Sequence, residues 1–393
     1  MNDGCLARIF ACVAASLLFA AAAVGADKPR ARDLGVPFEG TPGPLNAITD
    51  VAGVTVGQST IIRGEGALKV GEGPVRTGVT AVLPRGRAGS LNDPVFAGSF
   101  ALNGAGEMTG SHWIEESGFL EGPVMITNTH SVGAVHQGTI AWRIQQGPPD
   151  ATGYWWSNPV VAETWDGELN DINGFHVKEA NVFEALSSAR GGPVVEGNVG
   201  GGTGMICNGF KGGIGTASRR LPDQAGGYTL GVLVQCNCGR KRDLLVAGVP
   251  VGSEIAGAGA RDEDSGSIII VVATDAPLVA HQLKRLARRA ALGLARTGSR
   301  SGNGSGDIFI AFSTANSAIA ETEGPVSLKM LPNERMGALF EATVGATEEA
   351  IVNALVAGRT MTGRGGHRVL GLPQDQVRTI LDKHDLAAPG STR

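Results

Sequence analysis

Three short apolar runs constrain the fold of this chain more than any other feature. They span residues 228–235, 267–273 and 307–312 and read YTLGVLVQ, SIIIVVA and DIFIAF. Their apolar residues follow one another with little polar alternation, which is typical of strands covered on both faces. Residues 278–295 instead carry apolar residues three and four apart, opposite a row of Lys and Arg, as in an amphipathic helix. Buried strands and amphipathic helices in mixed order predict a layered α/β sandwich in a single domain.

The first 26 residues have the layout of a secretory signal. One cation, Arg8, precedes the apolar run IFACVAASLLFAAAAV, and small residues at 24–26 precede Asp27. This layout predicts cleavage after Ala26 and export of residues 27–393 to the periplasm or out of the cell. A membrane anchor needs roughly 18 to 20 uninterrupted apolar residues, and this run is shorter. We therefore expect no membrane association once the signal is removed.

Composition and motifs exclude several kinds of partner. The formal net charge is -4, which offers no basic surface for nucleic acid. The seven histidines contain no HExxH pattern and no close ligand pair, so they predict no metal site. The glycine-rich stretch at 197–215 contains neither GxxxxGK[ST] nor a GxGxxG that opens a helix, so it predicts no nucleotide cofactor. We expect a small-molecule or peptide substrate and no cofactor.

Three cysteines remain in the predicted exported chain, Cys207, Cys236 and Cys238. An odd number argues against a disulfide scaffold, although one pair can form in an oxidising compartment. Cys236 and Cys238 would share one face of a strand. A CxC pair without a second Cys or His pair nearby is nevertheless a weak zinc site. The sequence leaves the redox state of the three cysteines open.

The junction between Gly266 and Ser267 joins the polar segment RDEDSG to a buried strand. Such a junction can be an ordinary loop-to-strand turn. It also permits self-cleavage, because glycine tolerates strained backbone angles and the serine hydroxyl can then attack the carbonyl before it. Hydrolysis would free a serine α-amine, whose ordinary pKa of roughly 7.7 to 8.0 suits a base for its own hydroxyl. From these residues alone, both interpretations remain open.

Seven segments resemble one known family. They are NGAGEMTG (103–110), TNTHSVG (127–133), VVAETWDGELNDING (160–174), GNVGGGTGMICNGFKGG (197–213), LVQCNCG (233–239), GSIIIVVATDAPL (266–278) and GSGDIFIAFSTAN (304–316). In this order they are similar to the DmpA-type L-aminopeptidase/D-esterases and β-peptidyl aminopeptidases. The resemblance implies an N-terminal-nucleophile hydrolase with a four-layer αββα sandwich. It also implies cleavage into an α chain (27–266) and a β chain (267–393), and assembly into homotetramers.

The resemblance assigns roles to five residues. Ser267 would be the nucleophile freed by the cut after Gly266. Ser305 and Asp307 of the GSGD motif would assist it. Asn237 would help form the oxyanion hole, a role that suits a side-chain amide. Glu163 of the ETxDG motif would receive the free amino group of the substrate, because a carboxylate pairs well with an ammonium.

Two positions depart from the family's pattern. Asp307 stands where better-known members carry glutamate, so its carboxylate is one methylene shorter. Trp165, which the resemblance places in the substrate-binding site with Glu163, stands where some relatives carry a tyrosine near the oxyanion, and an indole donates only through its nitrogen. Without the resemblance, Asn237, Glu163 and Ser305 are equally well explained as ordinary loop and turn residues.

The expected function is that of a secreted, self-processing serine aminopeptidase. It would hydrolyse the amide after an unblocked N-terminal L-, D- or β-amino acid in short peptides, amides or esters. One alternative is an acyltransferase of the ornithine acetyltransferase type, which shares the sandwich but uses a threonine inside the cell. Another is a non-catalytic periplasmic binding protein. Ser267 and the export signal argue against the first alternative, and the retained serine, asparagine and carboxylates argue against the second.

Overall fold

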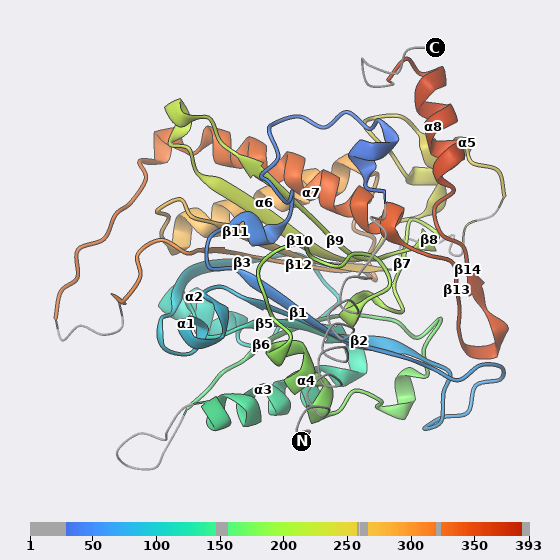
Figure 1. Cartoon of the computed structure of the whole chain (residues 1–393), viewed down its shortest axis with the longest axis horizontal. Helices are drawn as coiled ribbons and strands as arrows, with labels where there is room; N and C mark the ends of the chain where they lie inside the picture. The colour runs from blue at the N-terminus through green and yellow to red at the C-terminus, as the bar shows by residue number, and fades with distance from the viewer. Residues whose placement is uncertain (1–28, 147–155, 258, 260–265, 320–323, 387–393) are drawn as a thin grey trace, which may run out of the picture.

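The computed structural model of the chain (Figure 1) describes residues 29–146, 156–257, 259, 266–319 and 324–386. The predicted signal, residues 1–26, lies outside the described residues, as does most of the acidic segment before Gly266. Among the described residues, no helix has both the length and the apolar character needed to span a membrane.

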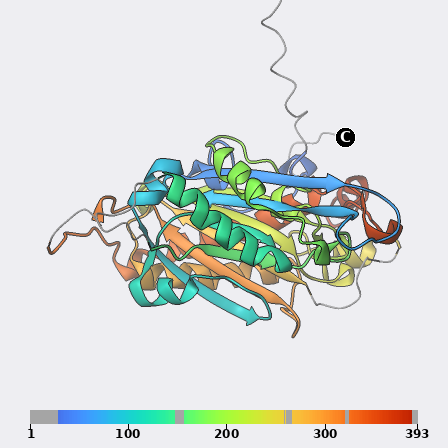
Figure 2. The ribbon, with the colours of Figure 1, turned by 90° about the horizontal axis from the view of Figure 1, so that it is seen from below.

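Two sheets stack face to face. The smaller sheet has the order β1-β2-β5-β6, with β5 and β6 parallel and the other neighbours antiparallel. Its strands are β1 (Thr55–Arg63), β2 (Val75–Leu83), β5 (Val124–Asn128) and β6 (Val160–Thr164). Two helices, α3 (Val132–Gln146) and α4 (Glu179–Ser187), cover its outer face, as the view from below shows (Figure 2).

The larger sheet has the order β4-β3-β12-β11-β10-β9, and only β11 and β12 run parallel within it. Its strands are β4 (Phe119–Leu120), β3 (Val95–Gly104), β12 (Gly306–Ser313), β11 (Ser267–Thr274), β10 (Thr229–Asn237) and β9 (Gly213–Arg220). Two helices, α6 (Ala280–Arg296) and α7 (Gly337–Ala357), pack on its outer face.

Shorter elements lie around these layers. The helices are α1 (Gly86–Asn92), α2 (Ser111–Ser117), α5 (Val251–Glu254) and α8 (Gln374–Lys383). Two small hairpins pair β7 (Ile206–Cys207) with β8 (Phe210–Lys211) and β13 (Met361–Thr362) with β14 (Arg368–Val369).

The side chains of β11 show why the layers form. Ile268 and Ile270 lie in the core beneath α6 and α7, whereas Ile269 and Val271 lie in the core between the two sheets. All eight residues of the strand are buried, as expected of a strand with an apolar layer on each face. A third core packs the smaller sheet against α3 and α4. The predicted αββα sandwich is therefore confirmed.

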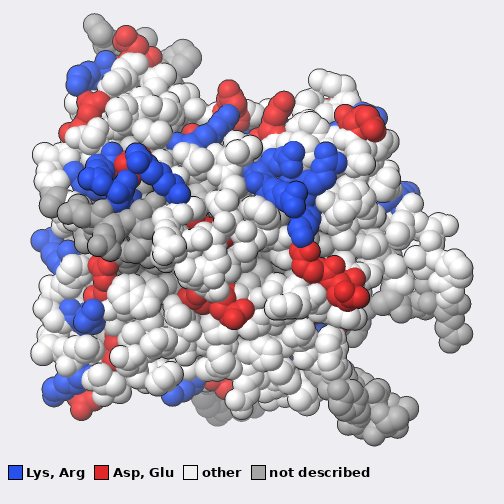
Figure 3. Space-filling view, turned by 180° about the vertical axis from the view of Figure 1, so that it is seen from behind, with Lys and Arg blue, Asp and Glu red and all other residues white. Residues whose placement is uncertain are grey.

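The basic row of α6 is held by specific contacts. Lys284 Nζ lies 2.5 Å from Glu115 Oε2 of α2, and the Arg288 guanidinium lies 5.5 Å from the centre of the Phe100 ring. Arg289 stacks on Phe340 at 3.9 Å. Figure 3 shows patches of Lys and Arg beside acidic side chains on the face that it draws. These three cations therefore contact acidic or aromatic side chains of the same chain.

The segment before β1 is anchored by a buried carboxylate on α7. Glu349 has no exposed side-chain area and forms ion pairs with Arg32 at 2.7 Å and Arg219 at 2.8 Å. The Asn46 amide also donates to it, at 2.6 Å. Burial alone would raise the pKa of Glu349, but the hydrogen bond from Arg32 and the charges of Arg219 and Arg32 lower it below its usual value. These contacts hold the N-terminal segment against the outer helix of the larger sheet.

Candidate active site

Ser267 is the first residue of β11 and lies directly opposite Asn237, the last residue of β10. The Ser267 side chain is buried, and its Oγ accepts the Gly306 backbone N–H at 3.1 Å. The sequence expectation of a strand that begins at this serine is confirmed. The antiparallel register between the two strands therefore brings the predicted nucleophile and the predicted oxyanion donor together.

The GSGD motif enters the same site from the other side of β11. Because β12 runs parallel to β11 with Asp307 opposite Ile268, Gly306 lies beside Ser267. Ser305 and Asp307 are fully buried, and Ser305 Oγ donates to Asp307 Oδ1 at 2.6 Å. Asp307 Oδ2 accepts the Ser301 hydroxyl. The shorter aspartate thus reaches Ser305, so the motif forms a connected pair in this chain.

Backbone groups from two different segments hold the Asn237 amide. Its Oδ1 accepts the Ile206 N–H at 2.8 Å, and its Nδ2 donates to the Trp165 carbonyl at 2.9 Å. The amide carries two hydrogens, and the bond to Trp165 uses one of them. An asparagine side chain fixed in this way can aim its other N–H at an oxygen bound next to Ser267.

Glu163 lies near the end of β6 and is 3% exposed. Its Oε1 accepts the Glu107 backbone N–H at 3.1 Å, and its Oε2 accepts the Thr129 hydroxyl. Burial raises the pKa of Glu163, while the hydrogen bonds from Thr129 and the Glu107 backbone oppose this shift in part. The Cβ of a residue at Gly106 would lie 3.0 Å from Gly306 and 3.1 Å from Glu163, so the segment that follows β3 passes between the carboxylate and the GSGD motif.

Trp165 contributes its backbone to the site. The residue is 39% exposed, and a Cβ at Gly167 would lie 2.5 Å from the indole ring, so the ring covers that glycine. Its carbonyl is the group that receives the Asn237 amide. In the sequence, Trp165 occupies the position of a tyrosine that lies near the oxyanion in some relatives. In the structure, Trp165 contacts Asn237 through its main-chain carbonyl.

The structure gives a further reason for glycine at position 266. The sequence noted that glycine tolerates strained backbone angles, and in the structure Gly266 is not among the residues with positive φ. A Cβ at this position would instead lie 1.8 Å from the Asn237 carbonyl oxygen and 2.8 Å from Cys238 Cα. A contact of that length is impossible, so the close approach of the two strands requires glycine here.

Sequence reasoning missed several residues that complete the site. Thr129, Glu107 and Ser301 bind the predicted carboxylates, and the Asn103 amide donates to the Ser305 carbonyl at 2.6 Å. Asn103, Glu107 and Thr129 belong to segments that carried the family resemblance, but no chemical role was assigned to them. Their contacts span 34 to 202 positions in sequence, so no local pattern could have revealed them.

The three cysteines meet beside Asn237. A disulfide joins Cys207 of β7 to Cys236 of β10, and the Cys238 sulfur lies 3.9 Å from each of theirs. The sequence allowed one pair without naming it. All three sulfur atoms lie within 4.8 Å of one another, so the three thiolates would be close enough to share a metal ion only if this disulfide were reduced. The sequence indicated a weak metal site because it considered only Cys236 and Cys238. The fold brings Cys207 next to this pair.

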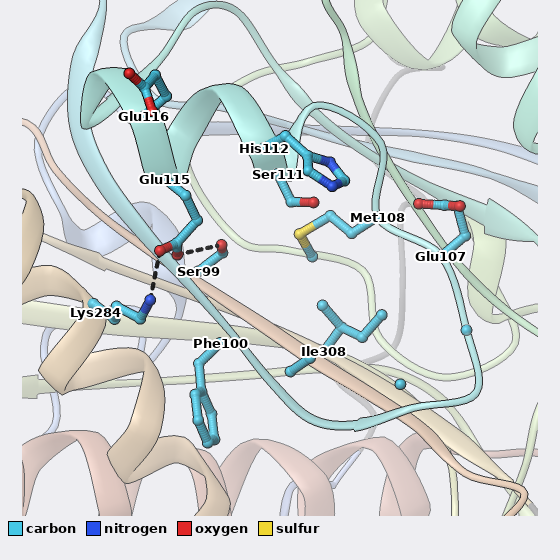
Figure 4. A pocket seen from close by; sticks show the side chains of 13 residues that line it. Ser99, Phe100, Glu107, Met108, Ser111, His112, Glu115, Glu116, Lys284 and Ile308 are labelled. Carbon is cyan, nitrogen blue, oxygen red and sulfur yellow. Dashed lines mark hydrogen bonds and ion pairs between the residues drawn. The ribbon is translucent and has the colours of Figure 1, made fainter.

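A cavity of about 500 Å³ adjoins the site (Figure 4). It shares the 104–108 loop with the Glu163 carboxylate, and its wall also includes Ile308 of β12. At the opposite wall, Glu115 binds Ser99 at 3.1 Å and Lys284 at 2.5 Å. Ser267 and Asn237 do not line this cavity. It therefore lies beside the reacting groups and can take a part of a substrate that extends away from them.

The arrangement suits the hydrolysis of an amide next to a free amine. A buried carboxylate, Glu163, can bind an ammonium, and a serine hydroxyl at the start of a strand can attack a carbonyl. An anchored amide can then stabilise the negative charge that develops on the carbonyl oxygen. The structure brings together the predicted Ser267, Ser305, Asp307, Asn237 and Glu163, whereas Trp165 takes part through its main chain.

Comparisons with known proteins agree with this chemistry. The sequence model of Peptidase family S58 matches residues 46–369. The β-peptidyl aminopeptidase BapA of Sphingosinicella microcystinivorans is 54% identical over 391 residues, which cover 95% of this chain and 97% of that protein. A solved β-aminopeptidase from Burkholderia sp. is 48% identical, with a TM-score of 0.83 and coverage of 90% of this chain and 99% of its own.

A third relative links the fold to a reaction class. The L-aminopeptidase D-Ala-esterase/amidase of Ochrobactrum anthropi is 48% identical, with a TM-score of 0.84 and coverage of 92% of this chain and all of its own. It is described as a prototype of the serine aminopeptidases with a variant of the Ntn hydrolase fold. The acyltransferase and binding-protein alternatives find no support among these relatives. The chain therefore belongs to Peptidase family S58 and is a serine aminopeptidase of the N-terminal-nucleophile type.

Proposed function

We propose that this enzyme releases N-terminal β-amino acids from short peptides and amides, and that Ser267 is its nucleophile. The observation that carries the mechanism is the pairing of Ser267 with Asn237 across β10 and β11, within the same site as Glu163. The substrate class is supported by the β-peptidyl aminopeptidase that is 54% identical. L- and D-amino acid derivatives form the second candidate class, because the Ochrobactrum relative acts as an L-aminopeptidase and D-Ala-esterase.

In the proposed reaction, Glu163 binds the free amino group of the substrate and places the first amide carbonyl next to Ser267. The α-amine of Ser267 accepts the hydroxyl proton as Oγ attacks, and the Asn237 amide stabilises the oxyanion. The hydroxyl of Ser305, held by Asp307, helps to pass this proton to the leaving amine as the carbon–nitrogen bond breaks. Water then hydrolyses the acyl ester and restores Ser267.

This mechanism requires a free α-amine, so we also propose that the chain cuts itself between Gly266 and Ser267. The position of Ser267 at the start of a buried strand supports this step. Gly266 supports it as well, because the nearby Asn237 carbonyl leaves no room for a side chain directly before Ser267. The layout of residues 1–26 supports export to the periplasm or beyond, with cleavage after Ala26. Assembly of the cut units into a homotetramer is the oligomeric state that the family resemblance implies.

One experiment tests these proposals together. The full chain is expressed with its own leader, and intact masses locate any break before Asp27 and before Ser267. Matched β-, α-L- and α-D-aminoacyl amides are then assayed with the purified enzyme. The β-aminoacyl amides should give the highest kcat/KM, and faster turnover of either α series would contradict the substrate proposal.

The nucleophile is tested by substitution. Ser267→Ala should remain a single chain without activity, whereas Ser253→Ala, which removes a surface hydroxyl bonded to Pro250, should be cut and active. An alanine variant at 267 that still appears as two chains would show that another group makes the cut.

A further inference from the structure

The hairpin of β7 and β8 (Figure 1) holds a lysine with no solvent exposure. Lys211 pairs with Ile206 in this hairpin. Its Nζ donates to the Met205 carbonyl at 2.7 Å, the Gly212 carbonyl at 3.0 Å and the Gly202 carbonyl at 3.4 Å. Lysine is rarely buried completely, because loss of hydration penalises its charge. Burial lowers the pKa of Lys211 to about 7, and the charge of Asp166 opposes this shift. A neutral amine has only two N–H donors, so the three carbonyl acceptors indicate the ammonium.

One of these carbonyls belongs to the peptide group that holds Asn237. The Met205–Ile206 peptide accepts from Lys211 at its oxygen and donates from its N–H to Asn237 Oδ1 at 2.8 Å. The ammonium, the peptide group and the asparagine amide therefore form one continuous chain of hydrogen bonds. The last group in this chain is the amide that faces the Ser267 end of β11.

The other side of the Asn237 amide is fixed by the segment after β6. Its Nδ2 donates to the Trp165 carbonyl, and the next residue, Asp166, is fully buried. The Asp166 carboxylate accepts from Asn128 at 3.1 Å and from Asn170 at 3.0 Å, which anchors this segment. The Asn237 amide is thus held between two segments. Lys211 anchors the Met205–Ile206 peptide group on one side, and Asp166 anchors the Trp165 carbonyl on the other.

Hydrogen bonds in a chain polarise one another, by roughly 10 to 30% per bond. The Lys211 ammonium, bound to the Met205 carbonyl oxygen, polarises this peptide group and makes the Ile206 N–H a stronger donor. Its bond to Oδ1 draws electron density from the Asn237 amide, so the amide N–H groups bind an anion more strongly. The same bonds fix the rotation of the amide before the substrate arrives, which is the condition for an effective oxyanion donor.

We propose that Lys211 is a positioning residue for the aminopeptidase reaction. Its ammonium holds and polarises the Met205–Ile206 peptide group and, through it, orients the Asn237 amide toward the oxyanion. This inference rests on the oxyanion role proposed for Asn237. It adds a residue that touches neither the substrate nor Ser267. Lys211 holds the amide in place beforehand, and its effect on the rate appears when charge develops in the transition state.

A double-mutant cycle tests this role. Lys211→Met keeps an unbranched side chain that is one atom shorter, and it removes the charge and the donors. We expect this change to lower kcat on a β-aminoacyl amide about tenfold with KM changed less than about twofold, because the interaction strengthens in the transition state. In the Asn237→Ala background the same change should cost less than about twofold, since its route to the oxyanion is gone. Rates are expressed per mole of cut enzyme, counted by intact mass.

Lys211→Gln provides a second measurement, including the case in which the methionine variant does not fold. Its amide keeps neutral donors for the carbonyls, so kcat should fall between those of the lysine and methionine enzymes, again only when Asn237 is present. Arg76→Met is the matched control. Arg76 is another buried cation, and it donates to the carbonyls of Arg63, Gly64, Val75 and Thr362. Its loss should lower the melting temperature and leave kcat per folded enzyme unchanged.

The outcomes separate the two proposals. If Asn237→Ala leaves kcat unchanged, the oxyanion role of Asn237 is wrong and the role of Lys211 is wrong with it. If Asn237→Ala lowers kcat but the Lys211 variants cost the same in both backgrounds, or nothing in either, Asn237 keeps its role and the inference about Lys211 is overturned. An equal, Asn237-dependent loss from Arg76→Met would also overturn it, because any buried cation would then have the same effect.

Discussion

Asn237 and Ser267 are directly opposite residues in the antiparallel pairing of β10 and β11. The geometry of the site depends on this register, because a shift by one residue would turn the Asn237 side chain to the opposite face of the sheet. The contacts of its amide with Ile206 and Trp165 then select one orientation of the side chain. The position of the oxyanion donor relative to the nucleophile is therefore set by the pairing of two buried strands.

Replacing Asn237 should damage turnover more than binding. We expect Asn237→Ala to lower kcat by about 10² to 10³ with little change in KM, because the donor acts on charge that is absent from the bound substrate. Steady-state kinetics on one β-aminoacyl amide measures both constants. Asn237→Asp keeps the shape but replaces the donor with an acceptor, so it should be no more active than alanine. An active aspartate variant would rule out donation by this side chain.

Glu163 should contribute a separate limb to the acidic side of the pH profile. The carboxylate binds the substrate ammonium only when ionised, and burial raises its pKa. The kcat/KM of the free enzyme should fall first as the Ser267 α-amine is protonated, near its ordinary pKa of roughly 7.7 to 8.0. It should fall again, more steeply, as Glu163 is protonated at a pH above the ordinary glutamate range. Glu163→Gln should raise KM strongly and abolish this second limb. A second limb that persists unchanged in the glutamine variant would assign it to another group.

Asp307 should be required as an anion. Its carboxylate accepts the hydroxyls of Ser305 and Ser301, and an amide at this position would offer only one acceptor oxygen. We expect Asp307→Asn to lower kcat by about 10², the lower end for an acid–base group. Asp307→Glu should keep more activity at the expense of a lower melting temperature, because the extra methylene enters a filled site. Equal activities of the asparagine and wild-type enzymes would contradict this assignment.

Gly266 should be irreplaceable even by alanine. The added Cβ would lie 1.8 Å from the Asn237 carbonyl oxygen, so the start of β11 must move away from β10. Gly266→Ala should therefore accumulate as uncut chain, which intact mass measures over time after purification. At Gly337 an added Cβ meets nothing within 4 Å, so Gly337→Ala is the control and should be cut at the wild-type rate. Normal cutting of the Gly266 variant would show that the close approach is dispensable.

Loss of the Glu349 carboxylate should destabilise the fold. Glu349→Gln would leave the buried Arg219 without its anionic partner, at a cost of about 3 to 5 kcal/mol. The folded-state pKa of Glu349 is lowered, so its contribution to stability is present above the unfolded-state pKa and is lost as the pH falls. The melting temperature should therefore drop in the variant at neutral pH and approach that of the wild type in acid. Glu341→Gln, at an exposed carboxylate on the same helix, is the control and should show no such shift.

The sequence predicted the layers, because they leave a local trace, and the family resemblance named residues that the structure brings together at one place. Uninterrupted apolar residues at 267–273 reported a strand buried on both faces, and the family motifs carried Ser267 and Asn237. The reason for glycine at 266 and the part played by Trp165 were not predicted. Both depend on main-chain atoms of residues distant in sequence, and a carbonyl oxygen is present in every residue and leaves no signature.

Lys211 illustrates the same limit. Its segment was noted for its glycines, and nothing in the pattern separates a buried lysine from one at the surface. Its importance follows from a bond between Ile206 and Asn237, which are 31 positions apart. Such a contact exists only once the hairpin of β7 and β8 has docked against β10, so local spacing cannot predict it.

The order of strands in the larger sheet has a consequence for the enzyme after the proposed cut. β11 and β12 follow the cut, yet they lie between β3 and β10, which precede it. The two fragments would therefore be interleaved, and they could not separate without breaking main-chain pairing on both sides. Once unfolded, the cut enzyme would have to recover its sheet by a bimolecular association, so its refolding would depend on concentration. The uncut precursor would refold in a unimolecular reaction, and maturation would thus make unfolding difficult to reverse in dilute solution.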